Sequence, residues 1–404
     1  MKNPRYEPGR INACVVEEPQ NAIVGDGLKN SRICLFCGAP PEDKNNEHPL
    51  PRWLLEMTGD PSRVVSHGYN WKTGKQFEFS FDSFKFPSCG ACNARYSSFE
   101  GEAKKVVEAI CKKEAVSPDD YVLLLDWLDK VRIGLWLGHR YLQGATWPPS
   151  FAIDSRIGVK DRMVAVYTIG DHQLGLNVYG AESRIFHWKP SVFSLRVNNI
   201  LFLNASWDWM CASRCGFPYP KVVRHSKSVH GALVLAQFTQ RRKVVHPVIP
   251  QLMKSCVTLC QPILQRQVDG SNSGVPSEML TETLRSQWRD RPGIGPLFRQ
   301  FKAETERVDP GDPPIEFDSV SIREANRAID IATQAYSLQN ESISSDTYTY
   351  EDGTPMNNRE AFMSALARIN TRTMRIFRTT PKATYEQLMR DAAARRLEKR
   401  RKGG

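Results

Sequence analysis

Two pairs of cysteines constrain the fold of this chain more than any other feature of its sequence. Two residues separate Cys34 from Cys37, and two residues separate Cys89 from Cys92. Each pair brings two thiolates to one metal ion, and two pairs supply the four ligands of a closed tetrahedral zinc site. Gly38, directly after the first pair, suits the tight turn that such a knuckle needs. The sequence therefore predicts a structural Zn²⁺ at these cysteines; the alternative is four unrelated buried or redox-active cysteines.

The segments around the second pair have a readable periodicity. Phenylalanines alternate with polar residues over 75–81, which predicts a strand, and Gly74 before it suits a hairpin turn. The apolar spacing over 93–114 predicts a helix that begins at the step from Cys92 to Asn93. A second long helix is predicted after Ser117, which together with the acidic residues that follow offers an N-cap and a negative first turn.

Length and composition divide the chain, because 404 residues exceed the usual size of one domain. The middle segment alternates helical stretches with short β-like runs, which predicts an α+β domain; the runs are 163–168, 174–179, 192–197, 200–203 and 232–238. We expect an α+β protein with five parts: a flexible leader (1–30), a small zinc-stapled module (31–115), a larger α+β accessory domain (116–268), a linker region (269–320) and a helical, basic C-terminal region (321–404).

The charge of the chain points to a polyanionic partner. The net charge is +11, with 55 Lys and Arg against 44 Asp and Glu, which favours contact with phosphate backbones. The basic run at 395–402 is either a sequence-independent grip on nucleic acid or a solvated helix end. The chain lacks a secretory signal and any apolar run of the roughly 18 residues that a membrane span requires. We therefore expect a cytoplasmic protein that makes no membrane contact.

Two short segments beside the cysteine pairs carry residues suited to catalysis. Residues 47–53 read Glu-His-Pro-Leu-Pro-Arg-Trp, and residues 92–100 read Cys-Asn-Ala-Arg-Tyr-Ser-Ser-Phe-Glu. With the cysteine pairs, they resemble the HNH endonucleases, also called ββα-metal or His-Me finger nucleases, of the bacterial type with four zinc-binding cysteines and a long C-terminal extension. The resemblance covers residues 34–100. It implies a ββα-metal module that hydrolyses phosphodiester bonds, with double-stranded DNA as the expected partner.

The resemblance also implies three catalytic residues. Glu47 matches the acidic residue that holds a divalent cation, His48 matches the general base, and Asn93 matches the helix residue that completes the cation site. A neutral imidazole takes a proton from water, and a cation neutralises the charge that grows on the phosphate. Oxygen ligands suit Mg²⁺ or Mn²⁺ better than zinc. The family's middle asparagine has no counterpart in 77–88, and the only candidate, Asn70, lies far upstream.

Glu100, Arg95 and His48 each have two possible roles. Glu100 falls at i+7 from Asn93 on the predicted helix, which makes it a candidate direct or indirect ligand of the divalent cation. Arg95 either grips a phosphate in a bidentate fork or is a solvated surface arginine. His48 is either the base or a histidine that caps a turn. The alternative for the whole module is a catalytically inactive zinc-stapled unit that binds nucleic acid or another protein; only a nuclease would lose activity in EDTA and regain it with Mg²⁺ or Mn²⁺.

Overall fold

A computed structural model gives the fold of a large part of the chain. It describes residues 33–41, 45–69, 76–80, 83–142, 152–169, 174–207, 210–211, 223–225, 233–235, 257–262, 297–301, 304–317, 321–322, 330–331, 333–345 and 359–379. The predicted leader (1–30), Asn70, the turn at Gly74 and the basic run at 395–402 lie outside the described residues. The helices are α1 (Arg52–Met57), α2 (Gly90–Cys111), α3 (Pro118–Leu142), α4 (Arg184–Trp188), α9 (Gln334–Ser345) and α10 (Arg359–Thr379).

The strands include all five of those predicted in the middle segment, together with short strands on either side of it. They are β1 (Asn45–Glu47), β2 (Val64–Tyr69), β3 (Gln76–Ser80), β4 (Phe86–Ser88), β5 (Arg162–Ile169), β6 (Leu176–Tyr179), β7 (Val192–Val197), β8 (Ile200–Ser206), β9 (Val223–His225), β10 (Leu233–Leu235), β11 (Val257–Gln261), β12 (Leu297–Phe301), β13 (Glu304–Val308) and β14 (Ser321–Ile322). The predicted α+β class is confirmed, since helices accompany a large antiparallel sheet.

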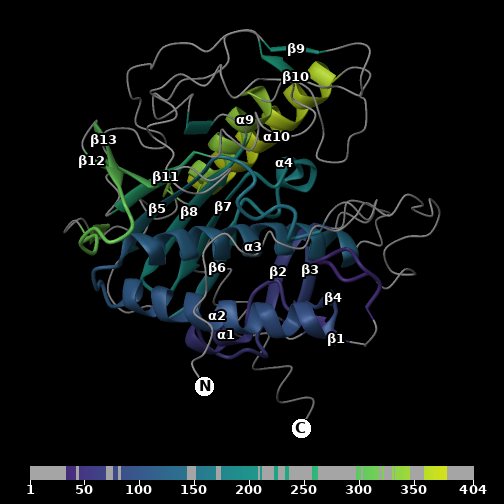
Figure 1. Cartoon of the computed structure of the whole chain (residues 1–404). Coiled ribbons are helices and arrows are strands. Elements are labelled where there is room, and N and C mark those ends of the chain that lie inside the picture. Colours follow the sequence, from purple (N-terminus) through teal and green to yellow (C-terminus); the bar gives the residue numbers. More distant parts are fainter. Residues whose placement is uncertain are drawn as a thin grey trace.

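An eight-stranded sheet lies between two layers of helices (Figure 1). Its order is β13-β12-β11-β5-β8-β7-β6, and β14 pairs with β5 in the parallel sense while the other pairs are antiparallel. Successive side chains of a strand point to opposite faces. Val164 and Val166 of β5 accordingly join the core that contains α3, whereas Met163 and Tyr167 join the core that contains α9. Burial on both faces explains why these strands read as continuous apolar runs.

Helix α3 occupies the interior between the sheet and α2 (Figure 1). From Leu123 to Arg140 every residue of this helix is buried, including charged residues such as Asp126, Asp129 and Lys130. Its predicted N-cap is confirmed, because Ser117 Oγ accepts a hydrogen bond from the Asp120 N–H at 3.2 Å. None of the helices described is both long and apolar enough to cross a membrane.

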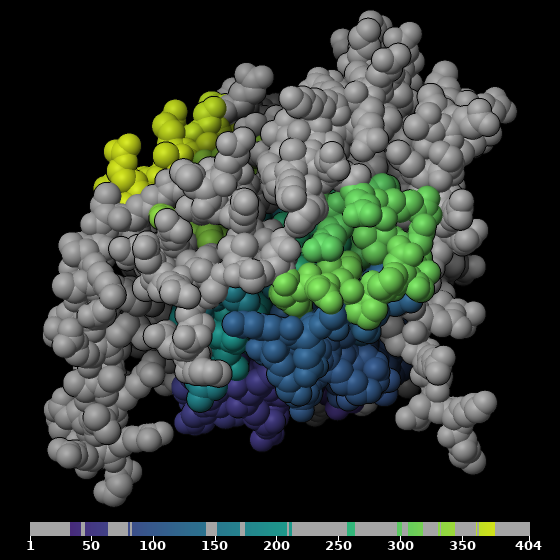
Figure 2. Space-filling view, turned by 90° about the vertical axis from the view of Figure 1, so that its left-hand side faces the viewer, coloured from purple at the N-terminus to yellow at the C-terminus, as the bar shows by residue number. Residues whose placement is uncertain are grey.

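The N-terminal segment adds two small antiparallel pairs to this body. Strand β1 pairs with β4, with Glu47 opposite Phe86, and β2 pairs with β3, which confirms the strand predicted over 75–81. One continuous core cluster includes Phe36 and Phe86 of this segment together with Trp127 of α3. In Figure 2 the purple residues of the N-terminal segment lie directly against the blue and teal residues of the body. The segment and the body therefore share a core.

The structure corrects three sequence-based expectations about boundaries. Helix α2 begins at Gly90, three residues before the predicted start, because the Cys89 side chain caps it and accepts the Cys92 N–H at 3.4 Å. The region 269–320, predicted to be a linker, contains β12 and β13, which extend the sheet. Residues 321–322, predicted to begin a helix, form strand β14. These strands are short and lie beside Gly- and Pro-rich stretches, so local composition hides a pairing that depends on the rest of the sheet.

Candidate metal centre and acid cluster

Four cysteines from two separate segments meet at one point. Their Sγ atoms, from Cys34, Cys37, Cys89 and Cys92, all lie within 4.8 Å of one another. Among the residues that the structure describes, no other group of three or more His, Cys, Asp or Glu side chains is close enough to hold a metal. Gly38 has a φ of 78° and donates its N–H to Cys34 O at 2.8 Å, as the predicted tight turn requires. Four thiols at this spacing fit a tetrahedral zinc ion.

The thiols of Cys34, Cys37 and Cys92 influence one another's pKa. Hydrogen bonds from Cys37 and then Cys92 lower the pKa of Cys34, whereas contacts with Cys34 and then Cys37 raise the pKa of Cys92. The opposite directions have one cause, since a negative charge on one sulfur opposes ionisation of the next. A divalent cation reverses this balance, since coordinated thiols are deprotonated outright. Four sulfurs that oppose one another's negative charge are therefore suited to share one cation.

Three polar side chains flank the sulfur cluster. Arg95 Nη2 lies 3.6 Å from Cys92 Sγ and forms an ion pair with Asp154, while Tyr96 donates its hydroxyl proton to Asp154 Oδ1 at 2.5 Å. Burial raises the pKa of Asp154, and the hydrogen bonds from Tyr96 and Arg95 oppose that rise. Four thiolates around Zn²⁺ carry two net negative charges, so a guanidinium beside Cys92 offsets part of that charge.

The loop that carries Asp154 also binds the first knuckle through its backbone. Ile153 donates its N–H to Leu35 O at 2.8 Å, and Asp154 donates its N–H to Phe36 O at 2.9 Å. On the other side, Leu35 donates its N–H to Pro87 O of β4 at 3.0 Å. The knuckle is therefore held between β4 and a loop that lies more than a hundred residues further along the chain.

A buried lysine gathers two of the predicted site residues and the backbone of a third. Lys130 of α3, whose side chain is 0% exposed, forms an ion pair with Glu100 of α2 and lies 3.9 Å from Glu47 Oε1. Its ammonium also donates to the carbonyl oxygen of His48 at 3.2 Å and lies 5.8 Å from the centre of the Phe36 ring. We refer to Lys130, Glu47, Glu100 and the His48 carbonyl as the Lys130 cluster.

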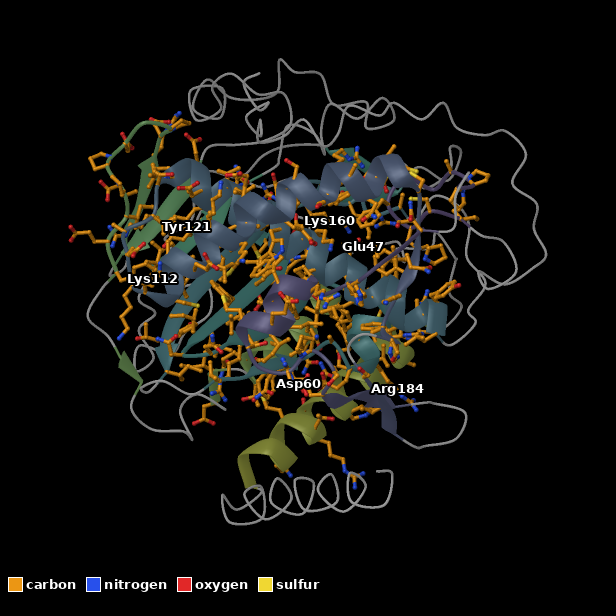
Figure 3. The ribbon with its side chains drawn as sticks, turned by 90° about the horizontal axis from the view of Figure 1, so that it is seen from below. Glu47, Asp60, Lys112, Tyr121, Lys160 and Arg184 are labelled. Carbon is orange, nitrogen blue, oxygen red and sulfur yellow. The ribbon has the colours of Figure 1, made fainter. Side chains whose placement is uncertain are left out.

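The two carboxylates of the Lys130 cluster differ in their surroundings. Glu100 is 9% exposed and bound directly by the ammonium, whereas Glu47 is 15% exposed and lies further from it. Burial is the largest cause that raises the pKa of Glu47; Lys130 opposes the rise and Glu100 adds to it. Glu47 is labelled in Figure 3, which views the molecule from the side on which α1 and α2 lie. Glu47 is thus the more exposed and the less tightly held of the two carboxylates.

Packing on α3 fixes the residue that follows His48. A Cβ added at Gly138 would lie 3.0 Å from Pro49 Cγ and 3.0 Å from the Phe84 ring, and one added at Gly134 would lie 3.5 Å from Pro49 Cα. Two glycines one turn apart therefore let Pro49 lie close to the helix. His48 is half-buried, and its Nδ1 atom is buried.

The remaining predicted site residues lie on the first turns of α2. Asn93 is half-buried and donates its backbone N–H to Cys89 O at 2.9 Å; no described contact links its side chain to Glu47 or His48. Arg95, predicted as either a phosphate contact or a solvated arginine, is 33% exposed and engaged by Asp154.

Sequence reasoning missed two residues of these sites, Lys130 and Asp154. Lys130 has a signal in the sequence, since it is a charged residue inside an otherwise apolar helical run, whereas the printed sequence around Asp154 gives none. No family model, curated protein or solved structure matches this chain. The function must therefore be argued from the geometry of the sulfur cluster and the Lys130 cluster.

Proposed function

We propose that this chain is a metal-dependent endonuclease of the HNH, or ββα-metal, type that hydrolyses phosphodiester bonds in nucleic acid, with double-stranded DNA as the expected substrate. One observation carries the proposal. Glu47 ends β1, His48 follows it, and the partner strand β4 passes through Cys89 alone into α2. This arrangement of β1, β4 and α2 supports the proposal, because the resemblance to HNH nucleases implies a histidine and a carboxylate on a ββα unit beside four zinc-binding cysteines.

In this proposal the zinc is structural and the chemistry belongs to other residues. Four cysteines leave a tetrahedral ion no open position for water or substrate. Glu47 and Asn93 would hold Mg²⁺ or Mn²⁺, which suits oxygen ligands, and the bound ion would supply positive charge for the phosphate and the leaving oxygen. The carboxylate of Glu47 fits this role because part of it is exposed.

His48 acts as the general base. Its backbone carbonyl accepts a hydrogen bond from Lys130, and the next residue, Pro49, packs against α3, so the imidazole is carried on a fixed main chain. Because Nδ1 is buried, the proton taken from water would go to Nε2. A base held in place in this way needs little reorganisation to reach the transition state.

Glu100 and Arg95 take narrower roles than the sequence alone suggested. Since Glu100 is ion-paired with Lys130, we assign it an indirect role, as the counter-ion that fixes the lysine. Arg95 already binds Asp154, so it would reach a phosphate only through the exposed third of its side chain. Direct coordination of the divalent ion then rests on Glu47 and Asn93.

The second candidate function is a catalytically inactive zinc-stapled module that binds nucleic acid or a protein. The contact of Lys130 with both acidic residues favours it, because a fixed ammonium already neutralises part of the charge that a divalent ion needs. The two candidates differ in one property, since only the nuclease cleaves nucleic acid in a metal-dependent reaction.

The test is nicking of supercoiled plasmid by the zinc-loaded full-length protein over a series of Mg²⁺ and Mn²⁺ concentrations. We expect activity that EDTA abolishes, and a loss of about 10²- to 10⁴-fold in rate for His48→Ala, the usual cost of removing a general base. Zinc content and thermal stability of this variant should match wild type. The matched control is Asn46→Ala, an exposed neighbour on β1, which should cut normally.

Two outcomes would replace the nuclease with the binding module. One is a wild-type protein that cuts neither duplex DNA, single strands nor RNA with any of these ions. The other is a His48→Ala variant that cuts as fast as wild type.

A further inference from the structure

The contacts of the Lys130 ammonium hold it in a fixed position. The ammonium donates hydrogen bonds to the Glu100 carboxylate and to the His48 carbonyl, the latter at 3.2 Å, and lies 3.9 Å from Glu47 Oε1 as an ion pair. The side chain is fully buried and its nitrogen lies over the Phe36 ring. Lys130 therefore cannot touch a phosphate, and its influence on the site is through its charge and its hold on these neighbours.

The positive charge of Lys130 lies close to Glu47 and therefore opposes the binding of a metal cation there. Glu47 and Glu100 bring two negative charges and Lys130 one positive charge, so the cluster carries a single net negative charge. Ions such as Mg²⁺ give up their bound water reluctantly. Proteins therefore commonly bind them through only one or two carboxylates, and phosphates of the substrate supply further ligands. A fixed cation near the carboxylate makes the protein's own share of such a site weak.

We infer that Lys130 makes divalent-cation binding at Glu47 depend on the nucleic-acid phosphate: the free protein binds the ion weakly, and the phosphate of the substrate supplies the missing negative charge. This inference rests on the proposed nuclease function. Its consequence is that the ion and the substrate assemble together on the protein. The site would then be loaded only when a bond to be cut is present.

The same contacts suggest why a lysine is used where a neutral residue would bind the metal better. Without Lys130, the carboxylates of Glu47 on β1 and Glu100 on α2 would repel each other, and the His48 carbonyl would lose its donor. The lysine thus has two effects: it stabilises the pair of carboxylates, and it lowers the affinity of that pair for free cations.

The experiment measures Mn²⁺ binding by electron paramagnetic resonance of the free ion, using zinc-loaded full-length protein in a series of charge variants. Lys130→Met makes the cluster more negative, and we expect it to bind Mn²⁺ about tenfold or more tightly than wild type. Glu100→Gln makes the cluster neutral and should bind more weakly. The double variant Lys130→Met/Glu100→Gln restores the wild-type net charge and should restore its affinity. Glu47→Gln should abolish binding in every background.

A second measurement tests the link to the substrate. Affinity for a short duplex is measured by fluorescence anisotropy with and without Mn²⁺ at fixed ionic strength, in the His48→Ala background so that the duplex stays intact. Coupling is reciprocal, so Mn²⁺ should strengthen duplex binding, and Glu47→Gln should remove that gain. Lys130→Met should reach the same gain at a lower Mn²⁺ concentration, because this variant binds the ion more tightly.

The outcomes separate this inference from the proposed function. If wild type cuts plasmid with Mn²⁺ while Lys130→Met binds Mn²⁺ no more tightly than wild type, the inference is overturned and the nuclease stands. If wild type neither cuts nor shows any Mn²⁺ effect on duplex binding, the nuclease itself is wrong. Should Lys130→Met fail to fold, the double variant and Glu100→Gln still decide: affinities that do not follow the net charge overturn the inference.

Discussion

Helix α3 buries charged groups on two sides, and the two groups are built differently. Toward the sheet, Arg162 Nη1 lies 2.6 Å from Asp126 and 3.1 Å from Asp129, while Arg132 lies 2.7 Å from Asp129 and donates to Asn204 Oδ1 at 2.5 Å. This sheet-side network has two carboxylates and two guanidiniums, hence no net charge. All four side chains are at most 3% exposed.

Toward the N-terminal segment, the Lys130 cluster has two carboxylates and one ammonium, and Glu47 remains partly exposed. The comparison teaches that burial of charge does not by itself mark a functional site. A balanced, closed network needs no further ion and serves the fold, whereas an unbalanced cluster with an accessible carboxylate has capacity for a ligand. The imbalance, rather than the burial, distinguishes the two.

The largest effect is expected where the balanced network is broken. Arg162→Met leaves Asp126 and Asp129 buried with too little positive charge, and the loss of one partner of a buried ion pair typically costs about 3 to 5 kcal/mol. The free energy of unfolding in urea measures it. Adding Asp126→Asn to Arg162→Met restores the balance and should recover part of the loss. A cost near zero for the single variant would break the comparison, because the network would then contribute nothing to stability.

An intermediate effect is expected where α3 meets the residue after His48. Gly138→Ala places a Cβ 3.0 Å from both Pro49 and the Phe84 ring, and such overpacking costs about 1 to 3 kcal/mol. Nicking should slow as well, because Pro49 carries the His48 main chain. The matched control is Gly101→Ala on α2, where a Cβ meets nothing within 4 Å and helix propensity gains up to about 1 kcal/mol. Equal unfolding energies for both variants would contradict close packing at Gly138.

The smallest expected effect is a gain in stability rather than a loss, and it comes from replacing Glu47. Because burial raises the pKa of Glu47 in the folded protein, the folded state binds this proton more tightly than the unfolded state. The ionised carboxylate therefore weakens the fold at neutral pH, and the cost vanishes as the pH falls through the folded pKa toward the unfolded one. Glu47→Gln should stabilise the protein by about 1 kcal/mol or less at neutral pH.

Thermal unfolding of Glu47→Gln and wild type from neutral to acidic pH checks this sign, provided that zinc content is confirmed at each pH. The stability gain of the variant should shrink as the pH falls. A variant less stable than wild type at neutral pH would show that the fold needs Glu47 as a partner of Lys130. The Lys130 cluster would then serve the fold, as the sheet-side network does.

The sequence predicted the local elements well where one residue pattern decides them. The apolar residues repeat every 2 residues over 75–81 and every 3.6 over 93–114, and these segments contain β3 and most of α2. The four cysteines of the two spaced pairs lie together in one cluster of sulfurs. The addition of β12 and β13 to the sheet was not predictable, since both strands are five residues long and the strand that joins them to the sheet, β11, lies at 257–261. Such short runs become strands only because the sheet offers an edge.

Two residues of the candidate sites, Lys130 and Asp154, were not predictable for a related reason. Spacing along α2 correctly put Glu100 on the same helix as Asn93, yet the partner of Glu100 comes from another helix, thirty residues away in sequence. A lysine inside an apolar helix signals a buried partner without saying which one. Asp154, which lies at the sulfur cluster, is separated from Arg95 by 59 residues, so no local pattern connects them. Long-range ion pairs are therefore where a single sequence is least informative.

The backbone bonds from Ile153 and Asp154 to the first knuckle affect the order in which the protein is completed during synthesis. Both cysteine pairs emerge from the ribosome before this loop exists. At about 5 to 20 residues per second, the 59 residues between Arg95 and Asp154 take roughly 3 to 12 s to add. A metal ion bound in that interval would sit in a knuckle whose carbonyls and arginine still face water. The later loop would then slow exchange of that ion, because its backbone bonds cover the first knuckle.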